Sequence, residues 1–197
     1  MNPIDLTLLH WLNGLAGRNA ALDALVTFVT TYAPLLFLLL FAVYFFASPR
    51  DRELRRRIVL AGIAGALAVA ASVGIGALVF RPRPFAVLPP GQVHLLVPHT
   101  EDSSFPSDHA MGSGAFAGGM WRAGGSARWA FLALAVLVAF SRAIAGVHWP
   151  SDLLASLLLG GIIAGLTLTV LRRPLLPVAD LIIHAVEAVE NRVRPQG

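Results

Sequence analysis

Residues 58–80, IVLAGIAGALAVAASVGIGALVF, form a long run without a single charged side chain. A helix needs about 20 mostly apolar residues to span a bilayer, because each residue adds about 1.5 Å across a hydrocarbon core of about 30 Å. The run therefore predicts a transmembrane helix, and it decides the class of the fold.

The composition of the 197-residue chain agrees with this class: hydrophobic residues make up 56% and charged residues 13%. A soluble fold of this length needs far more polar surface. The absence of cysteine excludes a secreted disulfide scaffold. The fifteen basic residues, all arginine, lie between apolar runs and not on one basic face. We therefore expect the lipid bilayer as a partner and no nucleic acid.

Four further segments outside residues 58–80 are candidate spans. Residues 25–47 and 153–171 are regular apolar runs, whereas 105–121 and 129–147 carry polar side chains near one end. Such polar ends cross only where protein or water lines their path. The sequence predicts an all-α fold, a polytopic membrane bundle of about five transmembrane helices.

Two shorter segments flank these spans and predict helices that lie in the membrane interface. Residues 4–15 are apolar but brief, and Asp5 stands where a signal peptide would be basic. After Arg172 and Arg173, apolar residues recur at helical spacing, as in an amphipathic surface helix. These tail residues are Val178, Leu181, Ile182, Ala185 and Val189.

The distribution of arginine predicts the orientation of the bundle. One side carries Arg50, Arg52, Arg55, Arg56, Arg57, Arg122, Arg128, Arg172 and Arg173. The opposite side carries only Arg18, Arg81, Arg83 and Arg142. Cytoplasmic loops are enriched in basic residues, so we predict that the arginine-rich side is cytoplasmic.

Three polar clusters fall on the other, extracytoplasmic side. They are Arg81-Pro82-Arg83-Pro84-Phe85, Phe105-Pro106-Ser107-Asp108-His109, and Ser141-Arg142 with His148 and Asp152. Ionisable groups at membrane depth are costly and usually functional. Clusters that meet on one face predict a binding or catalytic site.

The residue types in these clusters suit phosphoryl transfer. Arg83 and Arg142 are permanent cations whose planar forks match phosphate oxygens, with Arg81 as a further candidate. Ser107 and the helix start that follows it add neutral donors. Together these groups form an anion-binding set.

Histidine and carboxylate groups supply the remaining chemistry. If Asp152 holds one nitrogen of His148, the other nitrogen is free to act as a nucleophile. His109 lies on a different helix and is suited to protonate a leaving oxygen. This set needs no metal and no other cofactor.

The three clusters resemble the signature of the type 2 phosphatidic acid phosphatase superfamily, which also includes the vanadium haloperoxidases. That signature has a lysine separated by six residues from Arg-Pro, then Pro-Ser-Gly-His, then Ser-Arg-x5-His-x3-Asp. The third motif matches at every fixed position, through Ser141, Arg142, His148 and Asp152.

The other two motifs each depart at one position. Asp108 replaces the usual glycine of the second, a form that resembles bacterial bacitracin-resistance-type undecaprenyl-diphosphate phosphatases. Gly76 replaces the lysine of the first, and we expect Arg81 to substitute for it. Because a carboxylate repels phosphate, we expect Asp108 to pair with Arg81 or Arg142.

The resemblance implies a role for each matched residue. His148 would be the nucleophile that forms a phosphohistidine, Asp152 would orient it, and His109 would be the general acid. The residues that would hold the phosphoryl oxygens are Arg83, Arg142, Ser107 and Ser141. We predict one integral-membrane domain over residues 1–197, with an interfacial segment at 1–23, a catalytic core at about 59–171 and a cytoplasmic tail at 174–197.

The resemblance favours metal-independent hydrolysis of undecaprenyl diphosphate, which recycles the cell-wall carrier lipid at the bacterial inner membrane. A phosphatidylglycerophosphate or phosphatidic acid phosphatase is the alternative within this class. A serine hydrolase would use Ser107 but lacks the Gly-x-Ser-x-Gly setting. A non-catalytic anion-binding or transport protein would not need Asp152.

The loop 86–104 carries four titratable residues, His94, His99, Glu101 and Asp102. They could shape the mouth of the site or bind a metal, although their spacing fits no metal template. We favour ordinary solvated loop residues.

Overall fold

The computed structural model describes residues 2–48 and 51–193. Arg50 and residues 194–197 of the predicted tail lie outside the described residues. Every regular element of the described part is helical, so the all-α prediction is confirmed. The elements are α1 (Pro3–Asn13), α2 (Ala20–Ala47), α3 (Arg52–Leu78), α4 (Pro84–Val87), α5 (Asp108–Met120), a 3-10 turn (Trp121–Ala123), α6 (Gly125–Ile144), α7 (Pro150–Thr169) and α8 (Arg172–Val193).

Four of the described helices, α2, α3, α6 and α7, are long and apolar enough to cross a membrane. They contain the predicted spans 25–47, 58–80, 129–147 and 153–171, apart from residues at the ends of the runs. Asp51 begins α3 by accepting a hydrogen bond from the amide of Leu54 at 2.9 Å. The helix stops before Arg81-Pro82-Arg83-Pro84, because proline disfavours helical conformation in the residue before it.

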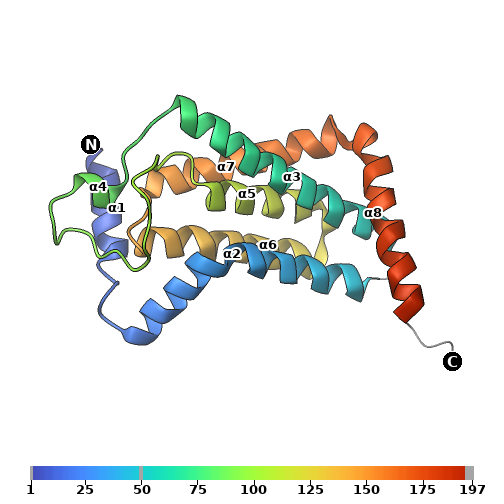
Figure 1. The fold of residues 1–197 in the computed structure, drawn as a ribbon, viewed down its shortest axis with the longest axis horizontal. Coiled ribbons are helices and arrows are strands. Elements are labelled where there is room, and N and C mark those ends of the chain that lie inside the picture. Colours follow the sequence, from blue (N-terminus) through green and yellow to red (C-terminus); the bar gives the residue numbers. More distant parts are fainter. Residues whose placement is uncertain (1, 49–50, 194–197) are drawn as a thin grey trace.

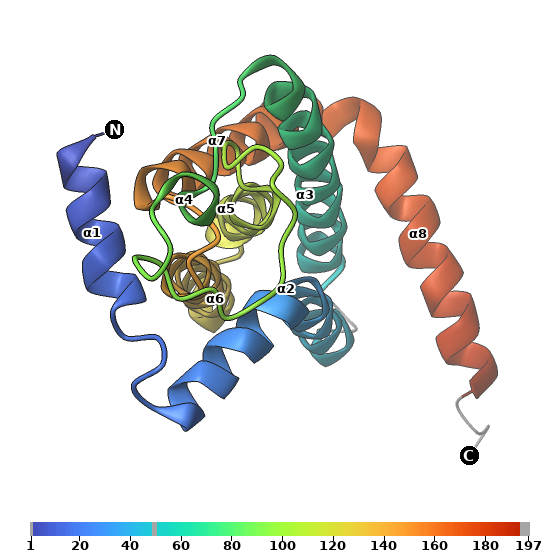
Figure 2. The ribbon, with the colours of Figure 1, turned by 60° about the vertical axis from the view of Figure 1, so that its left-hand side comes forward.

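The fifth predicted span is shorter than expected. Helix α5 has 13 residues, fewer than a full crossing requires, and it begins only at Asp108. It packs against α3, α6 and α7, and Figure 2 shows it enclosed by them. Protein therefore surrounds this polar-ended segment, which removes the need for a continuous apolar run.

Glycine allows α5 and α7 to approach closely. A Cβ at Gly114 would lie 2.1 Å from the carbonyl oxygen of Leu157, and one at Gly160 would lie 1.9 Å from that of Met111. Helices with small residues at their contact can bring their backbones together. This contact fixes His109, near the start of α5, relative to the start of α7.

The bundle is closed at each end by a helix that crosses it, with α1 at one end and α8 at the other (Figure 1). This arrangement fits the two predicted interfacial helices. On α8 the predicted apolar residues Val178, Leu181, Ile182 and Val189 are exposed. The face towards the bundle instead carries buried Ala179 and Ile183, so the outward apolar stripe is available to lipid.

The predicted arginine-rich side coincides with the α8 end of the bundle. Arg55 is 1% exposed, and its guanidinium pairs with Glu187 at 3.2 Å and Glu190 at 3.1 Å. It also lies 4.4 Å from the centre of the Phe45 ring. These contacts hold α8 against α3.

Candidate active site

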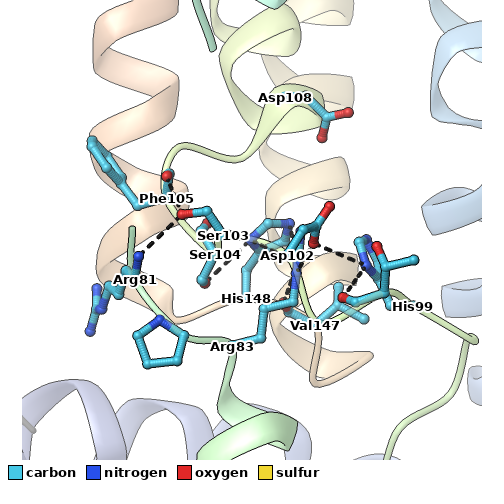
Figure 3. A network of polar contacts seen from close by, with 12 residues as sticks. Arg81, Arg83, His99, Asp102, Ser103, Ser104, Phe105, Asp108, Val147 and His148 are labelled. Carbon is cyan, nitrogen blue, oxygen red and sulfur yellow. Dashed lines mark hydrogen bonds and ion pairs between the residues drawn. The ribbon is translucent and has the colours of Figure 1, made fainter. Parts of the chain in front are cut away.

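The structure brings the three polar clusters together at the α1 end, around His148. Nε2 of His148 lies 3.1 Å from Nη1 of Arg83 and 3.1 Å from Nη2 of Arg142. Arg83 precedes α4, Arg142 lies in the last turn of α6, and His148 lies just before α7. Three segments that are distant in the sequence thus meet at one imidazole, and Figure 3 shows Arg83 beside His148.

The surroundings of His148 favour a neutral imidazole with a free electron pair on Nε2. The side chain is fully buried, and Nδ1 donates to the carbonyl oxygen of Ser104 at 2.8 Å. Burial, followed by the charges of Arg142 and Arg83, holds the pKa of His148 well below its usual value. The proton on Nδ1 leaves Nε2 as the acceptor that faces both guanidinium groups.

Asp152 reaches His148 through Ser104, not by the direct contact that we expected. The Ser104 hydroxyl donates to Oδ2 of Asp152 at 2.6 Å and lies 3.5 Å from Nδ1 of His148. Ser104 is fully buried. The sequence reasoning missed it, and its only signal is its position directly before the Phe-Pro-Ser-Asp-His cluster.

Arg81 occupies a different position from the phosphate contact we expected. Its guanidinium pairs with Asp5 of α1 at 2.5 Å and with Asp152, and it donates to Oγ of Ser151 at 2.8 Å. Figure 3 shows its side chain directed away from Arg83 and His148. In this geometry two carboxylates engage the charge of Arg81, and the expectation that it replaces the absent lysine stays a prediction.

A polar cavity of about 290 Å³ lies beside Arg83. Gly76, which stands at the lysine position, forms part of its wall, together with Asp102 and Asp108. A Cβ at Gly76 would have no atom outside its own helix nearer than 3.8 Å. The small residue therefore leaves space where the signature would place a long cation.

Two residues of the loop 86–104 belong to this site, which corrects our reading of them as ordinary solvated residues. Asp102 accepts from Nε of Arg83 at 2.7 Å, and Nε2 of His99 lies 3.1 Å from Nη2 of Arg142. Burial and the two arginines lower the pKa of His99. Burial acts to raise the pKa of Asp102, but the hydrogen bond and charge of Arg83 outweigh it and lower that pKa.

The other two titratable residues of the loop, His94 and Glu101, are exposed. Within residues 2–48 and 51–193, no three histidine, aspartate or glutamate side chains gather as a metal site would require. Of these four loop residues, only Asp102 and His99 therefore contact the arginines of the site.

Asp108 lies at the junction of two cavities, and its neighbour His109 lines one of them. Nδ1 of His109 is 2.9 Å from Oδ1 of Asp108, so Asp108 pairs with its neighbour and not with Arg81 or Arg142 as we expected. Both residues line an apolar cavity of about 520 Å³ whose walls come from α2, α3 and α5. Asp108 also lines the polar cavity.

The two serines predicted to bind phosphoryl oxygens are buried and bonded within their own helices. Ser107 caps α5 by accepting from the amide of Ala110 at 3.4 Å, which leaves its hydroxyl proton available. Ser141 donates to the carbonyl oxygen of Val138 at 2.8 Å. It must rotate before it can donate to a phosphate.

Comparison with known proteins gives the family of the chain. The family model described as the PAP2 superfamily matches residues 56–174. Undecaprenyl-diphosphatase BcrC of Bacillus subtilis is 33% identical over 183 residues, which cover 92% of this chain and 91% of that protein.

Two crystal structures resemble the fold. Aquifex aeolicus LpxE has a TM-score of 0.66 and 25% identity, over 85% of this chain and 96% of that one. A PAP2-type phosphatidylglycerolphosphate phosphatase from Bacillus subtilis has a TM-score of 0.52 and 17% identity, over 100% of this chain and 90% of that one. At that identity the second similarity shows the fold alone.

Proposed function

This chain belongs to the PAP2 superfamily, and from that membership we propose that it removes the terminal phosphate of undecaprenyl diphosphate. The family and the relative make it a membrane-embedded lipid phosphatase. One observation supports the proposed mechanism above all others. Nε2 of the buried His148 lies 3.1 Å from Nη1 of Arg83 and 3.1 Å from Nη2 of Arg142. The choice of lipid rests on the name of the Bacillus subtilis relative.

We propose that the terminal phosphoryl group binds Arg83 and Arg142 in place of the imidazole. Each guanidinium now donates to Nε2 of His148, and phosphate oxygens are stronger acceptors for it. Ser107 and, after rotation, Ser141 would complete the phosphate contacts. The exchange frees the electron pair of Nε2 next to the phosphorus atom.

In the first step Nε2 of His148 attacks the terminal phosphorus, and the bond from that phosphorus to the bridging oxygen breaks. His109 gives its proton to the departing undecaprenyl phosphate. The carbonyl of Ser104 and, through its hydroxyl, Asp152 stabilise the positive imidazole. Water then attacks the phosphohistidine, His109 takes its proton, and inorganic phosphate leaves with His148 regenerated.

The two cavities support a substrate with a charged head and an apolar chain. The polar cavity beside Arg83 would hold the phosphate, and the first isoprene units would lie in the apolar cavity of about 520 Å³. Asp108 lines both cavities and its neighbour His109 lines the apolar one, so His109 would approach the leaving oxygen from the side of the apolar chain. A soluble phosphate ester would leave the apolar cavity unused.

We propose that the site opens to the extracytoplasmic face of the bacterial inner membrane, as part of one membrane domain over residues 1–197. The supporting observation is that Arg52, Arg55 and Arg56 lie at the opposite end, beside α8. Undecaprenyl phosphate released there would re-enter the carrier cycle of cell-wall synthesis.

The test is phosphate release in detergent with a chelator present. Undecaprenyl diphosphate, phosphatidylglycerophosphate and phosphatidic acid are compared as substrates. We expect the wild type to favour undecaprenyl diphosphate, and H148A to lose at least 1000-fold in kcat because the nucleophile is absent. An acid-labile, base-stable phosphoenzyme should appear in the wild type and not in H148A.

The matched control is H184A, because His184 is an exposed histidine on α8 at the other end of the bundle. Equal turnover by H148A and the wild type would exclude His148 as the nucleophile. Preference for a glycerophospholipid would favour the alternative substrates, and no release from any lipid would favour anion binding without catalysis.

A further inference from the structure

Asp5 lies on α1, the helix that crosses the end of the bundle. The residue is buried, with only 2% of its surface exposed. It accepts from Nη2 of Arg81 at 2.5 Å, from the amide of Ser151 at 2.9 Å and from Oγ of Ser151 at 2.6 Å. A buried carboxylate is costly unless it is paired and hydrogen-bonded. All three contacts lie at the start of α7 or on the residue that pairs with Asp152.

Asp5 caps the start of α7 by accepting from the amide of Ser151, because no residue of α7 itself supplies a side-chain cap. The first amides of a helix have no partner within it, and the residue at the cap position, Trp149, makes no side-chain hydrogen bond to them. Asp5 bonds one of these amides from another helix, and its charge suits the positive end of the helix dipole. The turn that carries Asp152 is therefore fixed from α1.

Arg81 joins Asp5 to the catalytic groups at several points. Its Nη1 bonds Asp152, its backbone carbonyl accepts from the amide of Ser104 at 2.7 Å, and its guanidinium lies 5.3 Å from the Trp149 ring. Ser104 is also the residue that links Asp152 to His148. A continuous set of contacts thus runs from α1 to the imidazole.

We propose that Asp5 and Arg81 are positioning residues that fix the carboxylate of Asp152, and that α1 is a working part of the active site. This inference rests on the proposed roles of Asp152 and His148. Asp5 and Arg81 touch no substrate in this scheme. They act by holding one orientation of Asp152 and of the Ser104 segment.

The informative variant is D5N, which keeps the size of the side chain and removes its charge. Arg81 then loses one of its two carboxylates, and the Arg81–Asp152 pair is no longer held from α1. We expect kcat to fall about 10-fold, because small misplacements of catalytic groups are costly. KM should change by less than about twofold, because Arg83 and Arg142 are untouched.

The opposite reading is that Arg81 binds phosphate and Asp5 merely neutralises it. In that case D5N would release Arg81 towards the substrate, and KM would fall while kcat stayed the same. D5E should recover part of kcat, because it restores the charge. The control is D23N, because Asp23 accepts from the amide of Gly17 on the loop before α2 and is expected to leave both constants unchanged.

A second readout does not depend on turnover. Amide hydrogen exchange over residues 149–153 should be faster in D5N than in the wild type and unchanged in D23N, because the Ser151 amide loses its charged acceptor. Faster exchange with unchanged kcat would make the contact structural only and overturn the positioning role. Unchanged exchange together with unchanged kcat would overturn the whole inference.

The same series includes H148A, which separates this inference from the proposed function. If H148A keeps wild-type turnover, the proposed nucleophile is wrong. If H148A is inactive and D5N keeps its kcat, the nucleophile stands and only the positioning role fails.

Discussion

Two of the three polar groups of Ser104, its carbonyl and its hydroxyl, are bonded to residues of the proposed reaction. Its backbone carbonyl accepts from Nδ1 of His148 and its hydroxyl donates to Asp152. The carbonyl selects the tautomer in which Nε2 has a free electron pair. The hydroxyl links the Asp152 carboxylate to His148. A substitution that removes only the hydroxyl therefore separates this link from the selection of the tautomer.

We expect S104A to keep the tautomer and lose the link to Asp152, with kcat reduced about 10-fold and KM unchanged. The loss of a donor to a mostly buried carboxylate should also lower the free energy of unfolding by about 1–3 kcal/mol. Steady-state kinetics and thermal unfolding measure the two effects. The control is S126A, because Ser126 bonds Tyr44, outside the site. A wild-type kcat in S104A would show that Asp152 acts on His148 by another route.

At the scale of elements, the loop that precedes α5 pairs with the arginines in place of substrate. Asp102 bonds Arg83 and His99 bonds Arg142. A phosphate that binds the same guanidinium groups shares their positive charge with these partners or replaces them. The loop therefore competes with substrate for its binding groups.

The strength of this competition can be measured with D102N. The Asp102 side chain is 60% exposed, and exposed ion pairs are worth about 0.2–1 kcal/mol. We expect KM to fall by a factor of up to about 5, with kcat unchanged. The neighbouring variant E101Q, at an exposed glutamate, should leave KM as it is. A higher KM in D102N would mean that Asp102 assists substrate binding.

The long helices could be predicted from the sequence, whereas single polar contacts between elements could not. Apolar runs and motif spacing predicted the long helices and the meeting of Arg83, Arg142 and His148. They did not predict Asp5 or Ser104, because a single polar residue has no periodicity and Asp5 meets Ser151 across 146 residues of sequence. The short α5 was missed because only the tertiary arrangement shows that protein surrounds it.

At the scale of the whole molecule, the two ends of the bundle have separate tasks. The α1 end holds the proposed site, and the α8 end is held together by ion pairs between α3 and α8. A change at the α8 end should therefore alter stability without altering catalysis.

Arg55 allows this separation to be tested. Loss of one partner of a buried pair costs about 3–5 kcal/mol. We expect about 2 kcal/mol for R55M, because Glu187 and Glu190 are partly exposed. Thermal unfolding should give a lower Tm, while kcat per folded molecule stays at the wild-type value. R173M, at an exposed arginine, serves as the control. A reduced kcat in R55M would indicate that the two ends are coupled.

The position of Asp5 has a practical consequence for handling the protein. Asn2 caps α1 by accepting from the amide of Ile4 at 3.0 Å, and Asp5 follows it at the active site within one helical turn. An affinity tag or fluorescent protein fused ahead of Asn2 would therefore crowd the catalytic groups. The same fusion placed beside α8 would sit at the other end of the bundle, away from the proposed site.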